Sequence, residues 1–340
     1  MKNKKQVTIL DVAERAGVSR ATAGRIIGNY GTASEEAKEK VLRAIKELDY
    51  TPNVIAQGLR SKSTKTIGVV VGSIKNNFCN QFLYAVEKVC LDKGYNVLFC
   101  NTNEEPGREI EQLKNLRARQ VDGIVLISAI SKSKGIPKQY KSLYTGMPIA
   151  LADRRIKDLN LDIVTSGNFK GAYDATKHFI DLGHRKIAVL ASSSYSTILE
   201  RLDGYRQALQ DHEIEHDETL ELIAPFNDAF NEDSIKELLE KNPGITAIMV
   251  LNNSLLCRLL EGLRNLNYRV PDDISVISWD DDDLNILMEI DTVVQQVEKM
   301  GQIAVERVFE LIDPSARKGE PLSVTLGTVF KERKSCRKME

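Results

Sequence analysis

The sequence is poor in the residue patterns that support metal, redox or nucleophilic chemistry. Its five cysteines form no CxxC pair, which argues against a disulfide framework or a zinc ribbon. No Walker loop, dinucleotide fingerprint, HExxH or GxSxG motif is present. We therefore expect a protein that is not an enzyme and that has no cofactor and no metal site. Four histidines lack ligand spacing on a single helical face: His178, His184, His212 and His216.

Long apolar segments are also missing. No run of about 18 uninterrupted apolar residues occurs, so we expect no transmembrane helix and no membrane partner. The first ten residues, MKNKKQVTIL, lack the apolar stretch of a signal peptide, and we expect a cytoplasmic protein. A chain of 340 residues exceeds the usual size of one domain, which favours a small head with a larger body, or three units.

Charge is distributed unevenly along the chain although its sum is only −1. Residues 1–65 contain 13 Lys or Arg and 7 Asp or Glu, so this part carries +6 and the remainder carries −7. A basic head on an acidic body is typical of a protein that contacts phosphate groups with one end only.

The head contains the pattern of a helix-turn-helix in residues 8–25, TILDVAERAGVSRATAGR. Thr8 can cap a first helix, Gly17 can supply a left-handed turn, and Ser19 can cap a second helix. The side chains expected to project from the second helix are Arg20, Ala21 and Arg25. A third helix should begin after Ser34 and run through Tyr50 until Pro52 ends it, followed by a short weak helix and a polar linker.

After residue 65, apolar strands alternate with amphipathic helices, which predicts parallel sheets covered on both faces. The first series of strands is expected at 67–71, 96–100, 123–127 and 147–152. The second series is expected at 162–166, 186–192, 247–251 and 274–279. Two such series predict two similar α/β lobes, with a ligand in the cleft at the carboxyl ends of the strands.

Several segments identify a family resemblance that extends over nearly all of the chain. These segments are LDYTPNVIAQGL at Leu48, TIGVVV at Thr66, VDGIVL at Val121, GAYDATKHFIDLGHRKIAVL at Gly171, ERLDGYRQAL at Glu200 and VPDDISVISWDD at Val270. In order and spacing they resemble the lac repressor family (LacI/GalR) of bacterial transcription regulators. The resemblance implies a DNA-binding head at 1–51, a hinge helix and linker at 52–65, and a two-lobed effector-binding and dimerisation body, similar to periplasmic binding proteins, at 66–340.

The resemblance also implies which residues contact DNA. Arg20 and Ala21 occupy the two principal base-reading positions, and Arg25 occupies a further one. The positions expected to hold phosphates are Thr8, Ser19, Thr22 and Asn53. Ala56 and Leu59 belong to the hinge helix, whose leucine wedges into the minor groove in this family. Ala23 and Gly24 stand where the family commonly has valine and serine, so DNA affinity is expected to be modest, or the helix to order only on the operator.

In the body, the resemblance implies seven effector-binding residues, each after a predicted strand or at a loop that opens onto the cleft. They are Phe78, Asp153, Arg201, Phe226, Asn252, Trp279 and Asp280. Trp279, the only tryptophan, could instead be a buried core residue beside a solvated acidic loop. The family often has NPFF and ND where this chain has NNFC and NN, and Arg154 and Arg155 follow Asp153. These departures favour a sugar acid or sugar phosphate slightly over a neutral sugar.

Together these features predict a homodimeric repressor of carbohydrate uptake or catabolism genes that binds pseudo-palindromic operator DNA. The tail KERKSCRKME has no apolar repeat, which favours a dimer over a tetramer. One alternative is a global catabolite regulator of the same family, with a phosphorylated carrier protein as corepressor. Another is a sugar-binding transport component or an enzyme on the same body, which would leave the N-terminal head unexplained.

Overall fold

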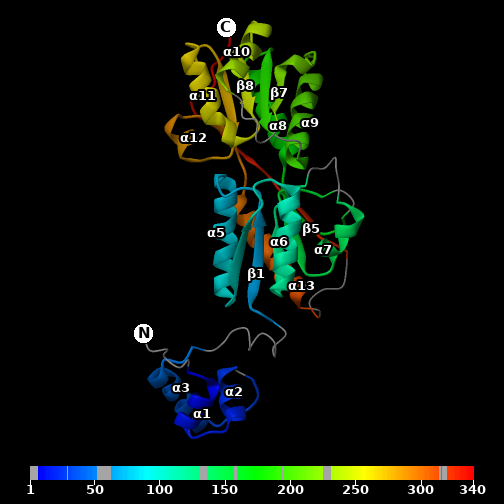
Figure 1. Ribbon diagram of the computed structural model, residues 1–340. Helices are drawn as coiled ribbons and strands as arrows, with labels where there is room; N and C mark the ends of the chain where they lie inside the picture. Colours follow the sequence, from blue (N-terminus) through cyan, green and yellow to red (C-terminus); the bar gives the residue numbers. More distant parts are fainter. Residues whose placement is uncertain are drawn as a thin grey trace. The chain divides into compact units, whose positions relative to one another are not determined.

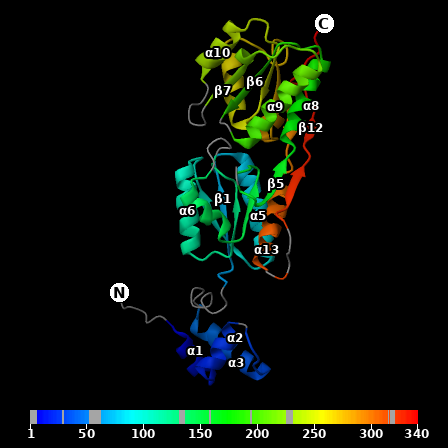
Figure 2. The ribbon, with the colours of Figure 1, turned by 90° about the vertical axis from the view of Figure 1, so that its right-hand side faces the viewer.

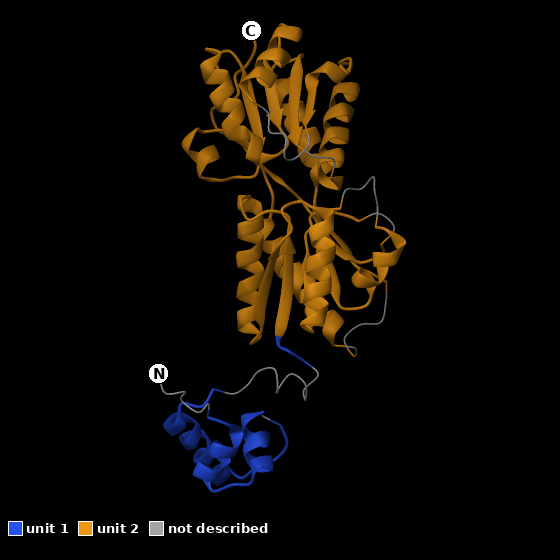
Figure 3. Cartoon of the chain, in the orientation of Figure 1, with its two compact units in different colours: residues 1–65 blue, residues 66–340 orange. Residues whose placement is uncertain are grey.

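The computed structural model describes residues 7–28, 30–51, 63–130, 136–156, 159–192, 195–224, 231–313, 315 and 320–340. The chain divides into two compact units, residues 1–65 and 66–340 (Figure 3). We call the first unit the head and the second the body. None of the helices in the described ranges has both the length and the apolar character needed to cross a membrane.

The head consists of three helices, α1 (Ile9–Ala16), α2 (Arg20–Ile27) and α3 (Glu35–Leu48). Each begins at the predicted cap, because the hydroxyl oxygens of Thr8, Ser19 and Ser34 accept hydrogen bonds from backbone N–H groups of the first turn. Gly17 ends α1 with a φ of 66°, the left-handed conformation expected of it. A small core holds the helices together: Val12, Ala13, Ala16, Ala23, Val41 and Ala44.

The end of α3 differs from the prediction. The helix stops at Leu48 and does not run through Tyr50 to Pro52, because Asp49 adopts a left-handed conformation with a φ of 48°. The Asp49 N–H group closes the last turn on the carbonyl oxygens of Ile45 and Lys46. The predicted hinge helix, with Asn53, Ala56 and Leu59, lies outside the described residues.

The first lobe of the body is built on a six-stranded sheet of order β11-β5-β4-β3-β1-β2, with parallel pairing throughout (Figures 1 and 2). Its strands are β1 (Thr66–Val71), β2 (Asn96–Asn101), β3 (Gly123–Leu126), β4 (Ile149–Ala152), β5 (Asp162–Ser166) and β11 (Ser323–Leu326). Helices α5 (Asn77–Asp92) and α13 (Val297–Ile312) cover one face, while α6 (Pro106–Ala118) and α7 (Lys141–Thr145) cover the other. A short 3-10 helix, Lys138–Tyr140, precedes α7.

The second lobe repeats this plan with a sheet of order β12-β10-β9-β8-β6-β7. Its strands are β6 (Ile187–Ser192), β7 (Glu221–Ala224), β8 (Ala247–Val250), β9 (Ser275–Trp279), β10 (Asp291–Val294) and β12 (Val329–Lys331). Helices α8 (Asn168–Asp181) and α9 (Ser196–Asp211) pack on one face, and α10 (Glu232–Lys241) and α11 (Leu256–Asn265) pack on the other. Short helices Glu218–Leu220, Asn253–Leu255 and α12 (Asp283–Leu287) lie between the longer elements. Only the β10–β12 pair is antiparallel in this sheet.

The division of strands between the lobes corrects one prediction. Residues 162–166 were expected to open the second series, but as β5 they pair with β4 and complete the first sheet. The chain therefore passes between the lobes three times, from β5 to α8, from β10 to α13 and from β11 to β12. These connections bring the carboxyl ends of both sheets to the same cleft, which confirms the expected two-lobed α/β fold.

Candidate functional site

The exposed start of α2 is the surface of the head that fits the predicted reading role. Arg20 and Ala21, the first two residues of the helix, and Arg25, in its last turn, are all exposed, while Ala23 and Gly24 face the small core. The helix continues through Gly24 without interruption, although glycine costs about 1 kcal/mol relative to alanine inside a helix. The positive end of the helix dipole therefore lies beside an exposed arginine, an arrangement suited to phosphate and base contacts.

Hydroxyl groups organise the same helix start. Ser19 Oγ accepts a hydrogen bond from Thr22 N at 3.0 Å and lies 2.9 Å from Thr22 Oγ1. Arg25 Nη2 donates to Thr22 Oγ1 at 3.3 Å, which holds its guanidinium along the helix. Thr8 forms a capping box with Asp11, whose carboxylate accepts from Thr8 N at 2.7 Å. Thr8, Ser19 and Thr22 thus fix the backbone of the first two helices in addition to their predicted phosphate contacts.

In the body, two aspartates occupy equivalent positions of the two lobes. Asp153 follows β4 and Asp280 follows β9, and both have a φ of 63°. Each N–H group donates to the neighbouring strand, Asp153 N to Val164 O at 2.8 Å and Asp280 N to Val293 O at 2.9 Å. The left-handed backbone ends each strand abruptly. The two carboxyl groups therefore lie at the carboxyl ends of their sheets, where the two lobes face each other.

A pocket at this cleft is lined from both lobes. The first lobe contributes the start of α5 with Phe78, and also Val297 of α13; the second contributes Asp280 and residues beside β10. Lining residues that had not been predicted as effector contacts are Asn76, Asn77, Gln81, Asn253, Asp281, Val294, Gln295 and Val297. Phe78, a predicted effector residue, is buried and supplies an apolar surface for a ligand.

Arg201 is held rigidly beside the pair of aspartates. Its Nε donates to Asn168 Oδ1 at 2.9 Å and its Nη1 donates to the carbonyl oxygen of Leu251 at 2.6 Å. The guanidinium lies 3.9 Å from the centre of a Trp279 ring, a cation–π contact. Trp279 is fully buried, so its ring is not open to solvent. It packs against the Arg201 guanidinium from the core of the lobe.

Burial perturbs the charges of this cluster. It raises the pKa of Asp280 to about 6, even though Arg201 and the amide of Gln295, which donates to Asp280 Oδ1 at 2.6 Å, act in the opposite direction. Burial also raises the pKa of Asp153 and lowers that of Arg201 to about 10. Clustered groups with strongly perturbed pKa values are typical of binding sites.

Three buried polar atoms at the carboxyl edge of the second sheet have no hydrogen-bond partner among the described residues. They are Ser192 Oγ at the end of β6, Trp279 Nε1 at the end of β9 and Gln295 Oε1 just after β10. Asn252, a predicted effector residue at the end of β8, uses Oδ1 to accept from Ser192 N at 2.8 Å. Because buried polar groups are normally paired, this edge is suited to a hydroxylated ligand.

The arginines after Asp153 have partners within the protein. Arg154 makes a bidentate contact with Glu104, at 2.5 and 3.0 Å, and donates to Ser128 O at 3.0 Å. Its guanidinium also stacks 3.8 Å from the Tyr195 ring of the second lobe. Arg155 Nη2 donates to Ser323 Oγ at 3.0 Å. Arg154 therefore links the lobes, whereas the Arg155 guanidinium contacts β11 of its own lobe. Both guanidinium groups already have partners within the protein, which weakens the case for an acidic effector that rested on them.

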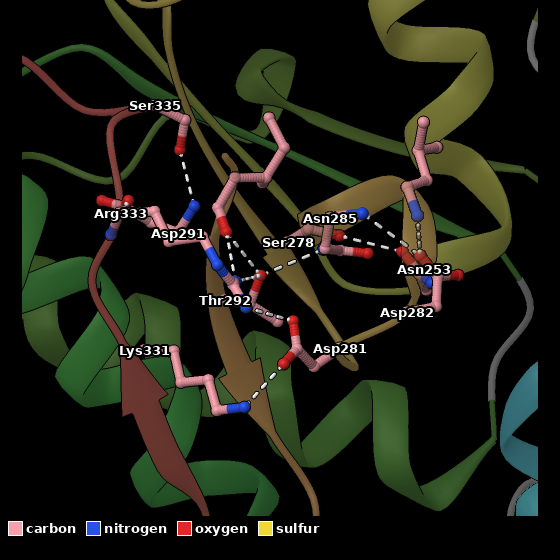
Figure 4. Close-up of polar contacts among 12 residues, drawn as sticks. Asn253, Ser278, Asp281, Asp282, Asn285, Asp291, Thr292, Lys331, Arg333 and Ser335 are labelled. Carbon is pink, nitrogen blue, oxygen red and sulfur yellow. Dashed lines mark hydrogen bonds and ion pairs between the residues drawn. The ribbon is translucent and has the colours of Figure 1, made fainter. Parts of the chain in front are cut away.

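The acidic run after Trp279 is largely tied down by contacts (Figure 4). Asp281 forms ion pairs with Lys331 at 2.7 Å and Arg333 at 2.6 Å. Asp282 caps α12 through Leu284 N and Asn285 N, and it also accepts a hydrogen bond from Asn253 Nδ2 at 2.5 Å. Asp281 and Asp282 therefore bind other residues at the edge of the cleft. Asp280, by contrast, accepts a hydrogen bond from Gln295 and interacts with the charge of Arg201.

Not all predicted residues can be placed. Phe226 lies outside the described residues, as do Asn53, Ala56 and Leu59 of the hinge. Of the predicted effector residues, Phe78 and Asp280 line the pocket, and the charges of Asp153 and Arg201 act on Asp280. Asn252 accepts a hydrogen bond at the same edge of the second sheet, and Trp279 lies in the core against Arg201. The sequence did not indicate Gln295, Asn168 or Glu104, which orient these groups. Asn168 begins α8 and Glu104 lies shortly after a predicted strand, whereas Gln295 follows β10, a strand that had not been predicted.

Comparisons with known proteins agree with this geometry. Residues 8–53 match the model for bacterial regulatory proteins of the lacI family, and residues 176–336 match the periplasmic binding protein-like domain. The HTH-type transcriptional regulator DegA of Bacillus subtilis (strain 168) is 32% identical over 302 residues, which cover 87% of this chain and 88% of DegA.

Two solved structures extend the comparison over the whole chain. The lac repressor dimer bound to operator and the anti-inducer ONPF has a TM-score of 0.83 and 25% identity, covering 98% of this chain and 100% of the repressor chain. The transcriptional regulator CelR in complex with cellobiose has a TM-score of 0.70 and 28% identity, covering 97% and 99% of the two chains.

The fold and its two candidate sites define a protein with a helix-turn-helix head and a periplasmic-binding-like body. The chain belongs to the lacI family of bacterial regulatory proteins and is a DNA-binding transcription regulator. The predicted family, fold class and regulatory function are thereby confirmed.

Proposed function

We propose that this regulator is a repressor of carbohydrate uptake or catabolism genes, and that a sugar-like effector bound in the cleft of the body controls its affinity for operator DNA. The observation that carries the effector part is the carboxyl edge of the second sheet, where Ser192 and the pocket-lining Gln295 each have a buried polar atom with no hydrogen-bond partner among the residues that the structure describes. The structure of CelR with cellobiose supports a sugar as the ligand class.

The charges of the cleft favour a neutral polyhydroxyl compound. Asp153 and Asp280 are hydrogen-bond acceptors for hydroxyl groups, whereas Arg154 already binds Glu104 and Arg201 already binds Asn168 and a carbonyl oxygen. An acidic ligand would bring its charge toward two partly compensated carboxylates, which is unfavourable in a site of low effective dielectric constant.

In the head, we propose that Arg20 and Arg25 read base edges and that Ala21 offers a methyl contact. Arg20 has the reach and the forked donors to bind a guanine, and its exposed position at the start of α2 supports this role. Thr8, Ser19, Thr22 and, in the hinge, Asn53 would contact phosphates. Ala56 would also contact DNA from the hinge, and Leu59 would enter the minor groove. A protein with this activity works where its DNA is, in the cytoplasm.

We further propose a homodimer, matching two half-sites of a pseudo-palindromic operator. Exposed apolar side chains support it. Tyr84 and Leu91 project from α5, with Leu91 67% exposed, and Ile286 and Leu287 project from α12, with Leu287 78% exposed. A second copy of the chain would cover such residues in both lobes.

A thermal-shift screen of neutral sugars, sugar acids and sugar phosphates against the full chain tests the proposal. We expect a neutral sugar to raise the melting temperature of the wild type and of Asp174→Ala, since Asp174 is an exposed residue of α8 that does not line the pocket, but not of Asp280→Ala. A sugar that alters operator binding yet stabilises Asp280→Ala as much as the wild type would contradict the assignment of the cleft.

A further inference from the structure

Three potential metal ligands from distant parts of the chain meet in the second lobe. His178 comes from α8, Asp291 is the first residue of β10, and Cys336 follows β12. One ligand atom from each lies within 4.8 Å of the other two, and His178 Nε2 is 3.8 Å from Asp291 Oδ2. Because Asp291 begins the strand that ends beside Gln295, this cluster lies at the end of β10 opposite to the effector cleft.

The spacing suits a tetrahedral ion. Zinc binds sulfur, nitrogen and oxygen ligands at about 2.0–2.3 Å, which places neighbouring ligand atoms roughly 3.3–3.7 Å apart. The 3.8 Å between His178 and Asp291 is already close to this range, and the widest separation would need to shorten by about 1 Å at most. His178 retains 21% of its side-chain exposure, so an ion and a water ligand could reach it.

The carboxylate is fixed with one oxygen turned toward the histidine. Asp291 Oδ1 accepts a hydrogen bond from Arg333 N at 2.6 Å, while Asp291 N donates to Ser335 Oγ at 2.7 Å (Figure 4). These bonds anchor the segment that carries Cys336 to the start of β10. Ligands that are held in this way by neighbouring hydrogen bonds are typical of metal sites.

The equivalent aspartate of the first lobe has an arginine partner, whereas no arginine in the described ranges forms an ion pair with Asp291. Its equivalent in the first lobe is Asp162, the first residue of β5, which accepts a hydrogen bond from Leu322 N at 2.6 Å and pairs with Arg307 at 3.1 Å. Asp291 keeps the backbone contact, but Arg333 directs its guanidinium to Asp281, Thr292 and a carbonyl oxygen. Within the described ranges, His178 is the only basic side chain at ion-pair distance from Asp291.

We propose that His178, Asp291 and Cys336 bind a zinc ion, with water as the fourth ligand, and that the ion takes the place that Arg307 holds beside Asp162. A donor set of one nitrogen, one oxygen and one sulfur suits zinc better than calcium or magnesium. On binding, the Cys336 thiol releases its proton to solvent and the thiolate sulfur bonds the ion. The ion fastens the C-terminal segment to α8 and β10, independently of the effector cleft.

The alternative of a reactive cysteine is unfavourable. Burial and the neighbouring carboxylate of Asp291 raise the pKa of the Cys336 thiol, so it is a poor nucleophile and a poor redox sensor without a metal. The expectation of no metal site, drawn from histidine spacing on single helical faces, could not detect ligands that come from three separate elements.

Cobalt titration of the full chain, after dialysis against a chelator, tests the proposal. We expect one Co²⁺ per chain, with a thiolate-to-cobalt charge-transfer band that Cys336→Ser abolishes. Cys257→Ser, which changes an exposed cysteine on α11, should leave the band unchanged. The absence of the band in the wild type, or its persistence in Cys336→Ser, would overturn the proposal.

A second variant guards against misfolding of Cys336→Ser. His178→Gln changes a partly exposed residue and should keep the wild-type circular dichroism spectrum. Added Zn²⁺ should raise the melting temperature of the wild type by several degrees, because only the folded chain assembles the site, and should leave His178→Gln unchanged. An equal rise in both proteins would place the bound zinc elsewhere.

Discussion

Asp280→Asn should stabilise the protein while impairing its response to effector. Burial raises the pKa of the Asp280 carboxyl to about 6 from 3.8, so the folded state holds its proton more tightly than the unfolded state. Stability contributed by the protonated form is lost as the pH rises from about 4 to about 6. A shift of about two units at about 1.4 kcal/mol each makes the ionised group cost about 3 kcal/mol above pH 6.

An asparagine avoids this cost and still accepts the hydrogen bond from Gln295. Asp280→Asn should therefore be more stable than the wild type by about 3 kcal/mol at pH 7.5, and the difference should vanish near pH 4, where the wild-type carboxyl is also neutral. Chemical unfolding can be followed by the fluorescence of Trp279, the only tryptophan and the neighbour of Asp280.

Asp281→Asn is the matched control. Despite its partial burial, hydrogen bonds from Lys331 and Arg333 lower the pKa of Asp281, so its ionised form stabilises the fold and the variant should be less stable at pH 7.5. The reasoning is refuted if Asp280→Asn is also less stable than the wild type, or if its gain in stability does not shrink in acid. Either result would mean that burial does not destabilise the ionised Asp280 carboxylate.

Three further variants test other parts of the structure. Arg20→Ala should weaken specific operator binding by about 1–3 kcal/mol and leave non-specific binding nearly unchanged in a mobility-shift titration; equal discrimination would refute its reading role. Leu59→Ala should preserve the dimer but reduce the measured DNA bend, and an unchanged bend would make Leu59 a linker residue. Gly204→Ala should lower the unfolding free energy by about 1–3 kcal/mol, because the new methyl group would lie 2.2 Å from Phe169 O. The control Gly107→Ala should be neutral, since its methyl group meets no atom within 4 Å. Equal stabilities of the two variants would contradict the close packing of α8 on α9.

The head could be predicted from sequence because its signals are local. Thr8, Ser19 and Ser34 cap helices whose first turns they contact directly, and Gly17 adopts the left-handed turn that its lack of a side chain permits. The end of α3 was missed because Asp49, unlike glycine, gives no clear signal that it will take the same conformation.

The body shows the limits of local patterns. The strand at 162–166 was recognised, but the sequence of a strand does not say which sheet the strand joins. Only the pairing of β5 with β4 places it in the first lobe. Family resemblance supplied Asp280 and Arg201. It could not supply Gln295 or Asn168, which lie 15 and 33 residues from the groups they orient and are brought to them by the fold.

The central claim is that occupancy of the cleft and binding of the operator are coupled. The most direct measurement is the affinity of the full chain for operator DNA with and without a saturating sugar, chosen as one that stabilises the wild type but not Asp280→Ala. Because such coupling is typically about 1–3 kcal/mol and reciprocal, we predict a change of roughly 5- to 150-fold, and an equal change in sugar affinity when operator is present. An operator affinity that is identical at zero and saturating sugar would contradict the account.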